Sequence, residues 1–239
     1  DTWEVKVISD LPNLGEIPLD ESNLVVKAAK ALAKFAGIEN PQPMRFEIQK
    51  QVPVAGGMAG GSADAAAALV ALNEAWCLGL GQTALMEVGG SIGADVPFAI
   101  LGGTALGSDT GIELSPHPQV LSQPIVLLIN NSPLSTKAVF QEFDRLDLGE
   151  ELSVPTFDET LAWLGKNSLT KAAFSLLPEL ADLAKQDFGC GTGLLSGSGP
   201  TLWYLAQDQA AAQNCAENIR AAGYQAVIAQ PSDKGSRLI

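Results

Sequence analysis

Short stretches in which apolar and polar residues alternate predict β-strands at several points of the chain. In residues 3–8 the side chains of Trp3, Val5 and Val7 fall on one side, and residues 45–50 alternate in the same way. The uninterrupted apolar run at 125–129 is typical of a buried strand. Further short strands are expected at 98–101, 103–106, 194–195, 201–205 and 224–229.

Apolar residues spaced three or four apart predict amphipathic helices between these strands. Segment 22–36 carries such a stripe, and we expect Ser22 to cap its start and Gly37 to end it. A second stripe, later in the chain, is formed by Ala65, Leu69, Leu72 and Trp76. Further helices are expected at 82–88, 135–145, 156–165, 171–187 and 208–222.

The order of these elements favours an α+β fold in two parts. Strands and helices mix without a regular βαβ repeat, which argues against a doubly wound parallel sheet. Segment 111–124 is rich in Pro, Ser and Gln, and we interpret it as a crossover between two lobes. A chain of 239 residues fits one large domain or two small domains that share a cleft. We expect an N-terminal lobe over residues 1–118 and a C-terminal lobe over residues 119–239.

Composition narrows the range of partners. The net charge is −13, from 14 basic and 27 acidic side chains. Nucleic acid is therefore not expected as a partner, because contacts to its phosphates need Lys and Arg. Free nucleotides stay open, because backbone N–H groups can hold a phosphate. No apolar run approaches the roughly 20 residues of a membrane helix, and no signal peptide is expected, so we predict a cytoplasmic protein without a membrane partner.

Cysteine and histidine offer little chemistry. The three cysteines, Cys77, Cys190 and Cys215, are far apart and odd in number, which argues against a disulfide framework or a zinc ribbon. We expect them to be buried fillers in a reducing compartment. The single histidine, His117, stands between two prolines, and we expect it in a solvated connection where it is a poor catalytic base.

A glycine-rich loop between a predicted strand and a predicted helix is the most informative segment. It comprises Pro53, Val54, Ala55, Gly56, Gly57, Met58, Ala59, Gly60, Gly61, Ser62 and Ala63. Glycine lets a backbone approach a ligand closely, and the free N–H groups of a helix start favour an anion such as phosphate. The alternative is a flexible connection. No lysine follows Gly60-Gly61, which excludes the Walker pattern, and the GxGxxG dinucleotide pattern does not fit either.

Two later segments carry weaker signals. Asp95, in Gly93-Ala94-Asp95-Val96-Pro97, could accept a hydroxyl proton or help to hold Mg²⁺, although such an Asp alone is more often a turn residue or a cap. Residues 196–200, Ser-Gly-Ser-Gly-Pro, lack the register of a nucleophile elbow, and we interpret them as a tight turn that supports the site. Phe140, on a predicted helix, is by itself most simply a core residue.

Together these motifs resemble the GHMP kinase superfamily. The loop at 53–65 resembles its ATP loop, 92–98 its catalytic-aspartate motif followed by 102–105, and 195–200 its glycine turn near the substrate. The likeness is greatest to members that act on a cytidine diphosphate derivative of methylerythritol. The resemblance implies an α+β fold of two lobes with the active site in the cleft between them.

The resemblance also implies roles for single residues. Residues 53–63 would wrap the phosphates of ATP, with Mg²⁺ as the metal, and Asp95 would act on the substrate hydroxyl as base or orienter. Phe140 would stack on the cytosine ring, at a position that matches the family, and stacking of this kind contributes roughly 1–3 kcal/mol. Thr136 and the turn residues Gly197, Ser198 and Gly199 would contact the substrate. The implied reaction is phosphorylation of the 2-hydroxyl of the methylerythritol part.

Alternatives stay open at this point. The chain could be a GHMP kinase for another small alcohol, such as homoserine or mevalonate, a nucleotide-binding protein without turnover, or a structural protein whose loop is incidental. The family begins with a Pro-x-Lys-x-Asn motif that Lys6 does not match, so we expect the first lobe to be N-terminally incomplete relative to the family. The family tends to have an acidic residue after the asparagine at 167, where this chain has Ser168, so we assign no role there. A monomer or weak homodimer is expected.

Overall fold

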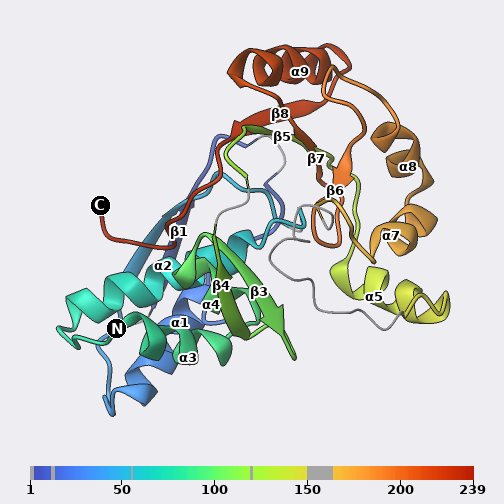
Figure 1. Ribbon diagram of the computed structural model, residues 1–239. Helices are drawn as coiled ribbons and strands as arrows, with labels where there is room; N and C mark the ends of the chain where they lie inside the picture. The colour runs from blue at the N-terminus through green and yellow to red at the C-terminus, as the bar shows by residue number, and fades with distance from the viewer. Residues whose placement is uncertain (1–2, 12–13, 55, 119–120, 150–163) are drawn as a thin grey trace. The chain divides into compact units, whose positions relative to one another are not determined.

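The computed structural model describes residues 3–11, 14–54, 56–118, 121–149 and 164–239 (Figure 1). The chain forms two compact units. The first unit contains Asp1–Val54, Ala59–Gln119 and Ser232–Ile239, and the second contains Ala55–Met58 and Val120–Pro231. The glycine-rich loop is therefore divided between the units, and the C-terminal segment belongs to the first.

The first unit begins with a β-α-β arrangement. Strands β1 (Glu4–Ile8) and β2 (Arg45–Gln49) are parallel and are joined by helix α1 (Leu24–Phe35). A parallel pair needs such a crossover, because a tight turn cannot return the chain in the same direction. Val5 pairs with Phe46 and Val7 with Ile48, so the alternating residues face one side as expected. Both expected strands are confirmed.

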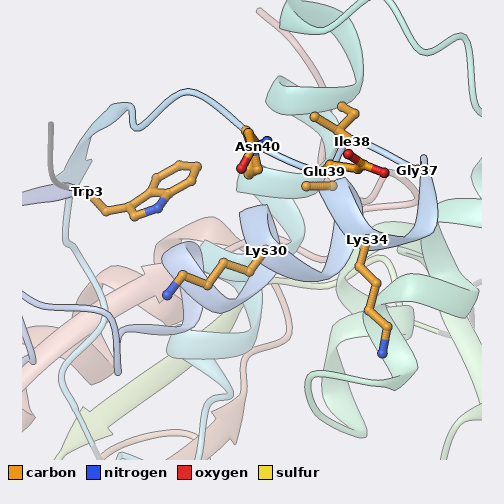
Figure 2. A pocket seen from close by; sticks show the side chains of 9 residues that line it. Trp3, Lys30, Lys34, Gly37, Ile38, Glu39 and Asn40 are labelled. Atoms are coloured by element: carbon orange, nitrogen blue, oxygen red, sulfur yellow. The ribbon is translucent and has the colours of Figure 1, made fainter.

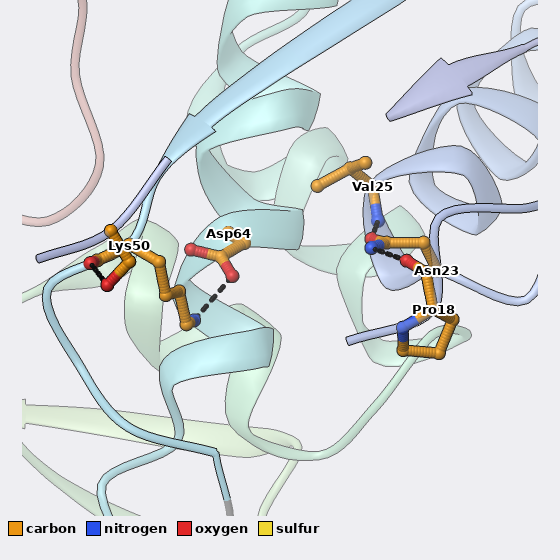
Figure 3. A network of polar contacts seen from close by, with 6 residues as sticks. Pro18, Asn23, Val25, Lys50 and Asp64 are labelled. Carbon is orange, nitrogen blue, oxygen red and sulfur yellow. Dashed lines mark hydrogen bonds and ion pairs between the residues drawn. The ribbon is translucent and has the colours of Figure 1, made fainter. Parts of the chain in front are cut away.

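The start of α1 differs from the expectation by one residue. Asn23, and not Ser22, is the N-cap: its side-chain oxygen accepts from the amide of Val25 at 3.0 Å, and its Nδ2 donates to the carbonyl of Pro18 at 2.6 Å (Figure 3). The hydroxyl of Ser22 instead donates to Asp20 at 2.6 Å. Asparagine and serine cap about equally well, so the sequence alone did not separate the two neighbours.

Three further helices complete the core of the first unit: α2 (Gly60–Ala75), α3 (Gln82–Gly90) and α4 (Asp95–Leu101). The strand expected at 98–101 is wrong, because α4 covers it. Val96 and Ile100, four residues apart, are both buried against α3 and α2, which is a helical spacing. Pro97 is tolerated because it lies in the first turn, where its missing N–H would have no partner in the helix.

A β-hairpin replaces the expected crossover. Strands β3 (Thr104–Ser108) and β4 (Glu113–His117) are antiparallel, and Asp109 and Gly111 between them have positive φ angles. The interpretation of 111–124 as a plain connection is therefore wrong over 113–117. His117 is half-buried in β4, opposite Thr104, rather than in a solvated loop.

A four-stranded antiparallel sheet forms the centre of the second unit. Its order is β6 (Leu194–Leu195), β7 (Leu202–Leu205), β5 (Ile125–Ile129) and β8 (Gln225–Ala229). Helix α9 (Gln209–Ala221) packs against β5 and β8, as Figure 1 shows. Buried side chains such as Leu128, Leu202 and Ile219 fill the space between them. The strands expected in this part of the chain and the helix at 208–222 are confirmed.

The second unit also contains α5 (Thr136–Arg145), α7 (Thr170–Leu176) and α8 (Pro178–Ala184). The single helix expected at 171–187 is wrong, since it is broken at Leu177, which has φ −135° and ψ 76°. A residue that precedes proline is disfavoured in the helical region, and Pro178 starts the next helix. Most of the helix expected at 156–165 lies outside the described residues. Within the parts of the chain that the structure describes, no helix is both long and apolar enough to cross a membrane.

The cysteines are free thiols in three different environments. Cys215 is buried, Cys190 is half-buried and Cys77 is exposed. The expectation of buried fillers therefore holds for Cys215 and is wrong for Cys77. Cys77 has φ 52° in the turn after α2, which places its side chain outside the core.

Candidate active site

The start of α2 presents unpaired backbone donors. Its N-cap, Ala59, has left-handed φ and ψ angles of 50° and 30° and provides no side-chain cap. The first helical hydrogen bond runs from the amide of Ala63 to Ala59, at 3.0 Å. The amides of Gly60, Gly61 and Ser62 donate to no acceptor among the described residues. Together with the helix dipole, these donors form a favourable site for a phosphate group.

A buried ion pair joins the two sides of the loop within the first unit. Lys50, directly after β2, contacts Asp64 on α2, with 2.5 Å between Nζ and Oδ2 (Figure 3). The Lys50 side chain is 5% exposed and that of Asp64 is 24% exposed. A Cβ on Gly60 would lie 3.0 Å from Nζ, so the ammonium is packed against the start of the helix. Sequence reasoning missed this pair, although a lysine directly before the loop and an aspartate directly after it were the available signals.

The first half of the glycine loop is held by the turn at 196–199, inside the second unit. The hydroxyl of Ser196 donates to the carbonyl of Gly57 at 2.8 Å. Gly57 has φ +70°, and a Cβ there would overlap the carbonyl oxygen of Ser196. The turn itself is closed by the Gly199 amide, which donates to Ser196 at 2.8 Å, and by the Ser196 amide, which donates to Thr201 at 3.0 Å. The first half of the loop and the turn are therefore packed together within the second unit.

Two side chains fix the far side of this turn. The hydroxyls of Thr136 and Ser198 are hydrogen-bonded at 2.9 Å, and Ser198 is buried. Asn167 donates through Nδ2 to the carbonyl of Gly197 at 2.7 Å and to that of Leu195 at 3.2 Å. The structure thus brings together Thr136, Gly197 and Ser198, for which substrate contact stays a prediction, and it adds Asn167, to which the sequence assigned no role.

Phe140 is not a core residue. It lies on α5 with 51% of its surface exposed, whereas its neighbour Val139 is fully buried. The simplest interpretation from the sequence is therefore wrong, because the helical period turns Phe140 away from the buried face. An exposed phenylalanine on a well-anchored helix is available for stacking on a planar ligand.

A carboxylate anchors α5 to α7. Glu142 on α5 accepts two hydrogen bonds from Arg145, at 2.6 and 2.7 Å, and one from the hydroxyl of Ser175 on α7, at 2.6 Å. The hydrogen bonds from Arg145, and next that from Ser175, lower the pKa of Glu142 from 4.5 to about 2. This cluster fixes the helix that carries Thr136 and Phe140.

Asp95 is the first residue of α4, and its carboxylate has no hydrogen-bond or ion-pair partner among the described residues. Its side chain is exposed. The N-cap of α4 is Ala94, so a capping role for Asp95 is not observed. A carboxylate without a partner can accept a proton from a hydroxyl or contact a cation.

The remaining residues of the expected loop differ in their exposure. Val54 is exposed and its amide donates to the carbonyl of Leu14 at 3.0 Å, and Pro53 is half-buried beside it. Ala55 lies outside the described residues. Gly56 is buried and Met58 is half-buried. No cluster of His, Cys, Asp and Glu side chains suited to a metal ion occurs in the described residues.

A surface hollow of about 700 Å³ lies elsewhere on the first unit (Figure 2). Trp3, Lys30, Lys34 and Asn40 are among the residues that line it, and none of the expected site residues does. Lys30 forms an ion pair with Glu21, with 2.6 Å between Nζ and Oε2. The hollow therefore shares no lining residue with the candidate site.

Comparison with protein families gives two matches that together cover most of the chain. The model described as the GHMP kinases N terminal domain matches residues 23–103, and the model described as GHMP kinases C terminal matches residues 142–225. The first includes the glycine loop and Asp95, and the second includes Asn167 and the turn at 196–199.

Individual relatives agree with these matches. A 4-diphosphocytidyl-2-C-methyl-D-erythritol kinase of Streptomyces coelicolor is 40% identical over 233 residues, which cover 92% of this chain and 77% of the relative. The enzyme of the same name from Nocardia farcinica is 44% identical over 225 residues, or 87% of this chain and 72% of the relative.

Solved structures show the same fold. A crystal structure of 4-(cytidine 5'-diphospho)-2C-methyl-D-erythritol kinase superposes with a TM-score of 0.71 at 29% identity, covering 95% of this chain and 82% of that one. Homoserine kinase from Cytophaga hutchinsonii reaches a TM-score of 0.73 at 19% identity, covering 100% and 86%, and shows the fold alone. The expected α+β kinase fold is confirmed, and the chain belongs to the GHMP kinase family.

Proposed function

We propose that this protein transfers the γ-phosphate of ATP to the 2-hydroxyl of 4-diphosphocytidyl-2-C-methyl-D-erythritol, a step in the non-mevalonate synthesis of isoprenoid precursors. The observation that carries the kinase chemistry is the uncapped, glycine-rich start of α2. The choice of substrate rests on the similarity to relatives that bear the name of this kinase.

In the proposed reaction the chain acts mainly by holding charge in place. The amides of Gly60, Gly61 and Ser62 would bind phosphate oxygens, and the Ser62 hydroxyl adds a further donor. Mg²⁺ is usually held by one or two carboxylates together with substrate phosphates, and the exposed carboxylate of Asp95, which has no partner among the described residues, could be one of them. When bound, Mg²⁺ would neutralise charge on the phosphates.

Asp95 is proposed to orient the substrate hydroxyl and to accept its proton. A carboxylate that is exposed and unpaired needs no partner to be displaced before it does so. Most of the rate enhancement in phosphoryl transfer comes from positioning and electrostatic stabilisation, so the orientation of this group matters as much as its basicity.

Recognition of the cytidine part is proposed to rest on α5 and the turn at 196–199. The exposed ring of Phe140 would stack on the base, and Glu142 keeps its helix in place. The bonded hydroxyls of Thr136 and Ser198, with the glycines beside them, would contact the rest of the substrate. A cytoplasmic monomer or weak homodimer is part of the proposal, and light scattering tests the oligomeric state.

An Asp95→Asn variant tests the proposed chemistry. With ATP, Mg²⁺ and the cytidine substrate, we expect kcat to fall by roughly 10²–10⁴-fold, because asparagine cannot accept the proton. Asp109→Asn is a matched control, since Asp109 is also exposed, lies in the same unit and has a φ of 55° that asparagine adopts readily. A loss below about threefold for Asp95→Asn would remove it from the proposed role.

A second candidate is a kinase for another small alcohol, because the GHMP kinase family match by itself does not name the substrate. A panel of alcohols that includes homoserine and mevalonate separates the two, because kcat/KM for the cytidine compound should exceed that for each of the others. Tight ATP binding by calorimetry without transfer to any alcohol would instead indicate a nucleotide-binding protein without turnover.

A further inference from the structure

The segment Ser232–Ile239 returns to the first unit and binds the end of helix α4. Ser236 donates twice to the carbonyl of Ala99, through its amide at 2.8 Å and through its hydroxyl at 3.0 Å. These bonds join residues 137 positions apart in the chain. A segment distant in sequence is therefore hydrogen-bonded to the helix that begins with Asp95.

Glycine at two positions allows this contact. A Cβ on Gly102 would overlap the backbone of Gly235, and a Cβ on Gly235 would overlap the carbonyl oxygen of Ile100. The neighbouring Gly103 also has a positive φ, of +71°, but a Cβ there would meet nothing closer than 3.7 Å. The two backbones are thus in direct contact at Gly102 and Gly235, and the packing is looser at Gly103.

The bonds from Ser236 complete the C-terminal end of α4. The last carbonyls of a helix have no partners within it and need hydrogen-bond donors from elsewhere. That of Phe98 accepts from the Gly102 amide at 2.8 Å, that of Ile100 from Gln82 at 3.1 Å, and that of Ala99 from Ser236. Since α4 has only seven residues, its stability depends on such external contacts.

We propose that Ser232–Ile239 is a positioning element for Asp95, an inference that rests on the proposed function. Val96 and Ile100 hold the buried face of α4 against α2 and α3, and Ser236 holds its last turn, one helical turn beyond Asp95. Without the second anchor α4 frays from its C-terminal end, and the backbone that carries Asp95 loses its fixed position. A misplacement of about 1 Å at a reacting group costs up to roughly 100-fold in rate.

Variants at the contact test the inference. Ser236→Pro removes the amide donor, and Gly235→Ala forces the backbones apart. For each we expect kcat to fall by roughly tenfold or more, with the KM for ATP within about twofold of the original, because the amides at the start of α2 are untouched. Ser236→Thr should retain kcat and Ser236→Ala should lose less than Ser236→Pro. Ser232→Ala is the control, since among the described residues the Ser232 hydroxyl bonds only to Lys234, within the segment.

Hydrogen exchange gives a readout that does not depend on activity. The Gly102 amide closes the last turn of α4, so its protection should fall in Ser236→Pro and Gly235→Ala and stay unchanged in Ser232→Ala. The inference is overturned if both variants keep kcat within about twofold, or if kcat and the ATP KM worsen together. It is also overturned if Gly102 stays protected. If the original protein phosphorylates no alcohol, the proposed function fails, and the exchange result still decides whether the segment anchors α4. Should Ser236→Pro not fold, the graded series Ser, Thr and Ala at 236 decides: equal kcat in all three overturns the inference.

Discussion

Replacing Asp64 with asparagine would leave the ammonium of Lys50 buried without a counter-charge. The change keeps the size of the side chain and one acceptor oxygen, so it removes mainly the charge. Removing one partner of a buried ion pair costs about 3–5 kcal/mol, and Lys50, at 5% exposure, is the more deeply buried partner. We expect Asp64→Asn to lower the free energy of unfolding by about 3 kcal/mol. Lys50→Met should cost about 1–2 kcal/mol, because the remaining aspartate is 24% exposed and can be hydrated.

The double variant Lys50→Met, Asp64→Asn tests whether the second change raises or lowers the free energy of unfolding. Adding Lys50→Met to Asp64→Asn removes the unpaired buried charge and leaves a methionine of similar length. The double variant should therefore be more stable than Asp64→Asn alone, by about 1–2 kcal/mol. A second change that restores stability is expected only if the damage of the first is a buried charge without a partner.

Urea unfolding followed by tryptophan fluorescence measures these differences. In a Trp163→Phe, Trp203→Phe background the remaining tryptophans are Trp3 and Trp76, both in the unit that contains the ion pair. The midpoint and slope then report on that unit, and all variants are compared in the same background.

The exposed pair Lys6–Glu47, with 3.0 Å between Nζ and Oε2, is the matched control. Glu47→Gln should cost less than about 1 kcal/mol, because both side chains are about half exposed to water. The reasoning is refuted if Asp64→Asn costs no more than Glu47→Gln, or if Lys50→Met destabilises the Asp64→Asn protein further.

Three further predictions concern the second unit and the substrate. Gly57→Ala should lower the free energy of unfolding in urea by about 3 kcal/mol, and Gly191→Ala by about 1–2 kcal/mol. Both glycines have a positive φ, but of the two only Gly57 has other atoms where a Cβ would lie, so equal costs would contradict the prediction. Since hydrogen bonds lower the pKa of Glu142 to about 2, its carboxylate stabilises the fold above pH about 4.5, and this contribution is lost as the pH falls towards 2. In Glu142→Gln the urea midpoint should therefore fall less steeply between pH 4.5 and 2, and an unchanged pH dependence would contradict the prediction. Phe140→Leu should raise the KM for the cytidine substrate by roughly 5–150-fold without changing that for ATP, whereas Phe35→Leu, at another exposed phenylalanine, should change neither.

Errors in the expected elements arose where local signals were balanced. Pro97 suited either the start of a strand or the first turn of a helix, and only the packing of Val96 and Ile100 on α3 and α2 selected the helix. Residues 113–117, within a segment rich in Pro, Ser and Gln, formed a strand because β3 lay beside them and offered hydrogen bonds. In each case a neighbour distant in sequence supplied the deciding energy.

The candidate site divides in the same way. The phosphate loop, Asp95 and the glycine turn were predicted as site residues from the sequence, because glycine spacing and an acidic residue in a fixed order are local features. Lys50 and Asn167 were missed, since a single lysine or asparagine acquires meaning only through its partner. Their partners, Asp64 and the Gly197 carbonyl, are 14 and 30 residues away.

By itself the sequence determined the α+β class, most helices and strands, the family and the loop that suits a phosphate, because these depend on periodicity, glycine placement and motif order along the chain. Only the tertiary structure decided that the first half of this loop packs on the turn at 196–199, that a buried ion pair joins its two sides, and that Ser236 closes the helix of Asp95. The physical reason is that a hydrogen bond or ion pair forms wherever folding brings its two partners together, and their separation in sequence carries no record of that meeting.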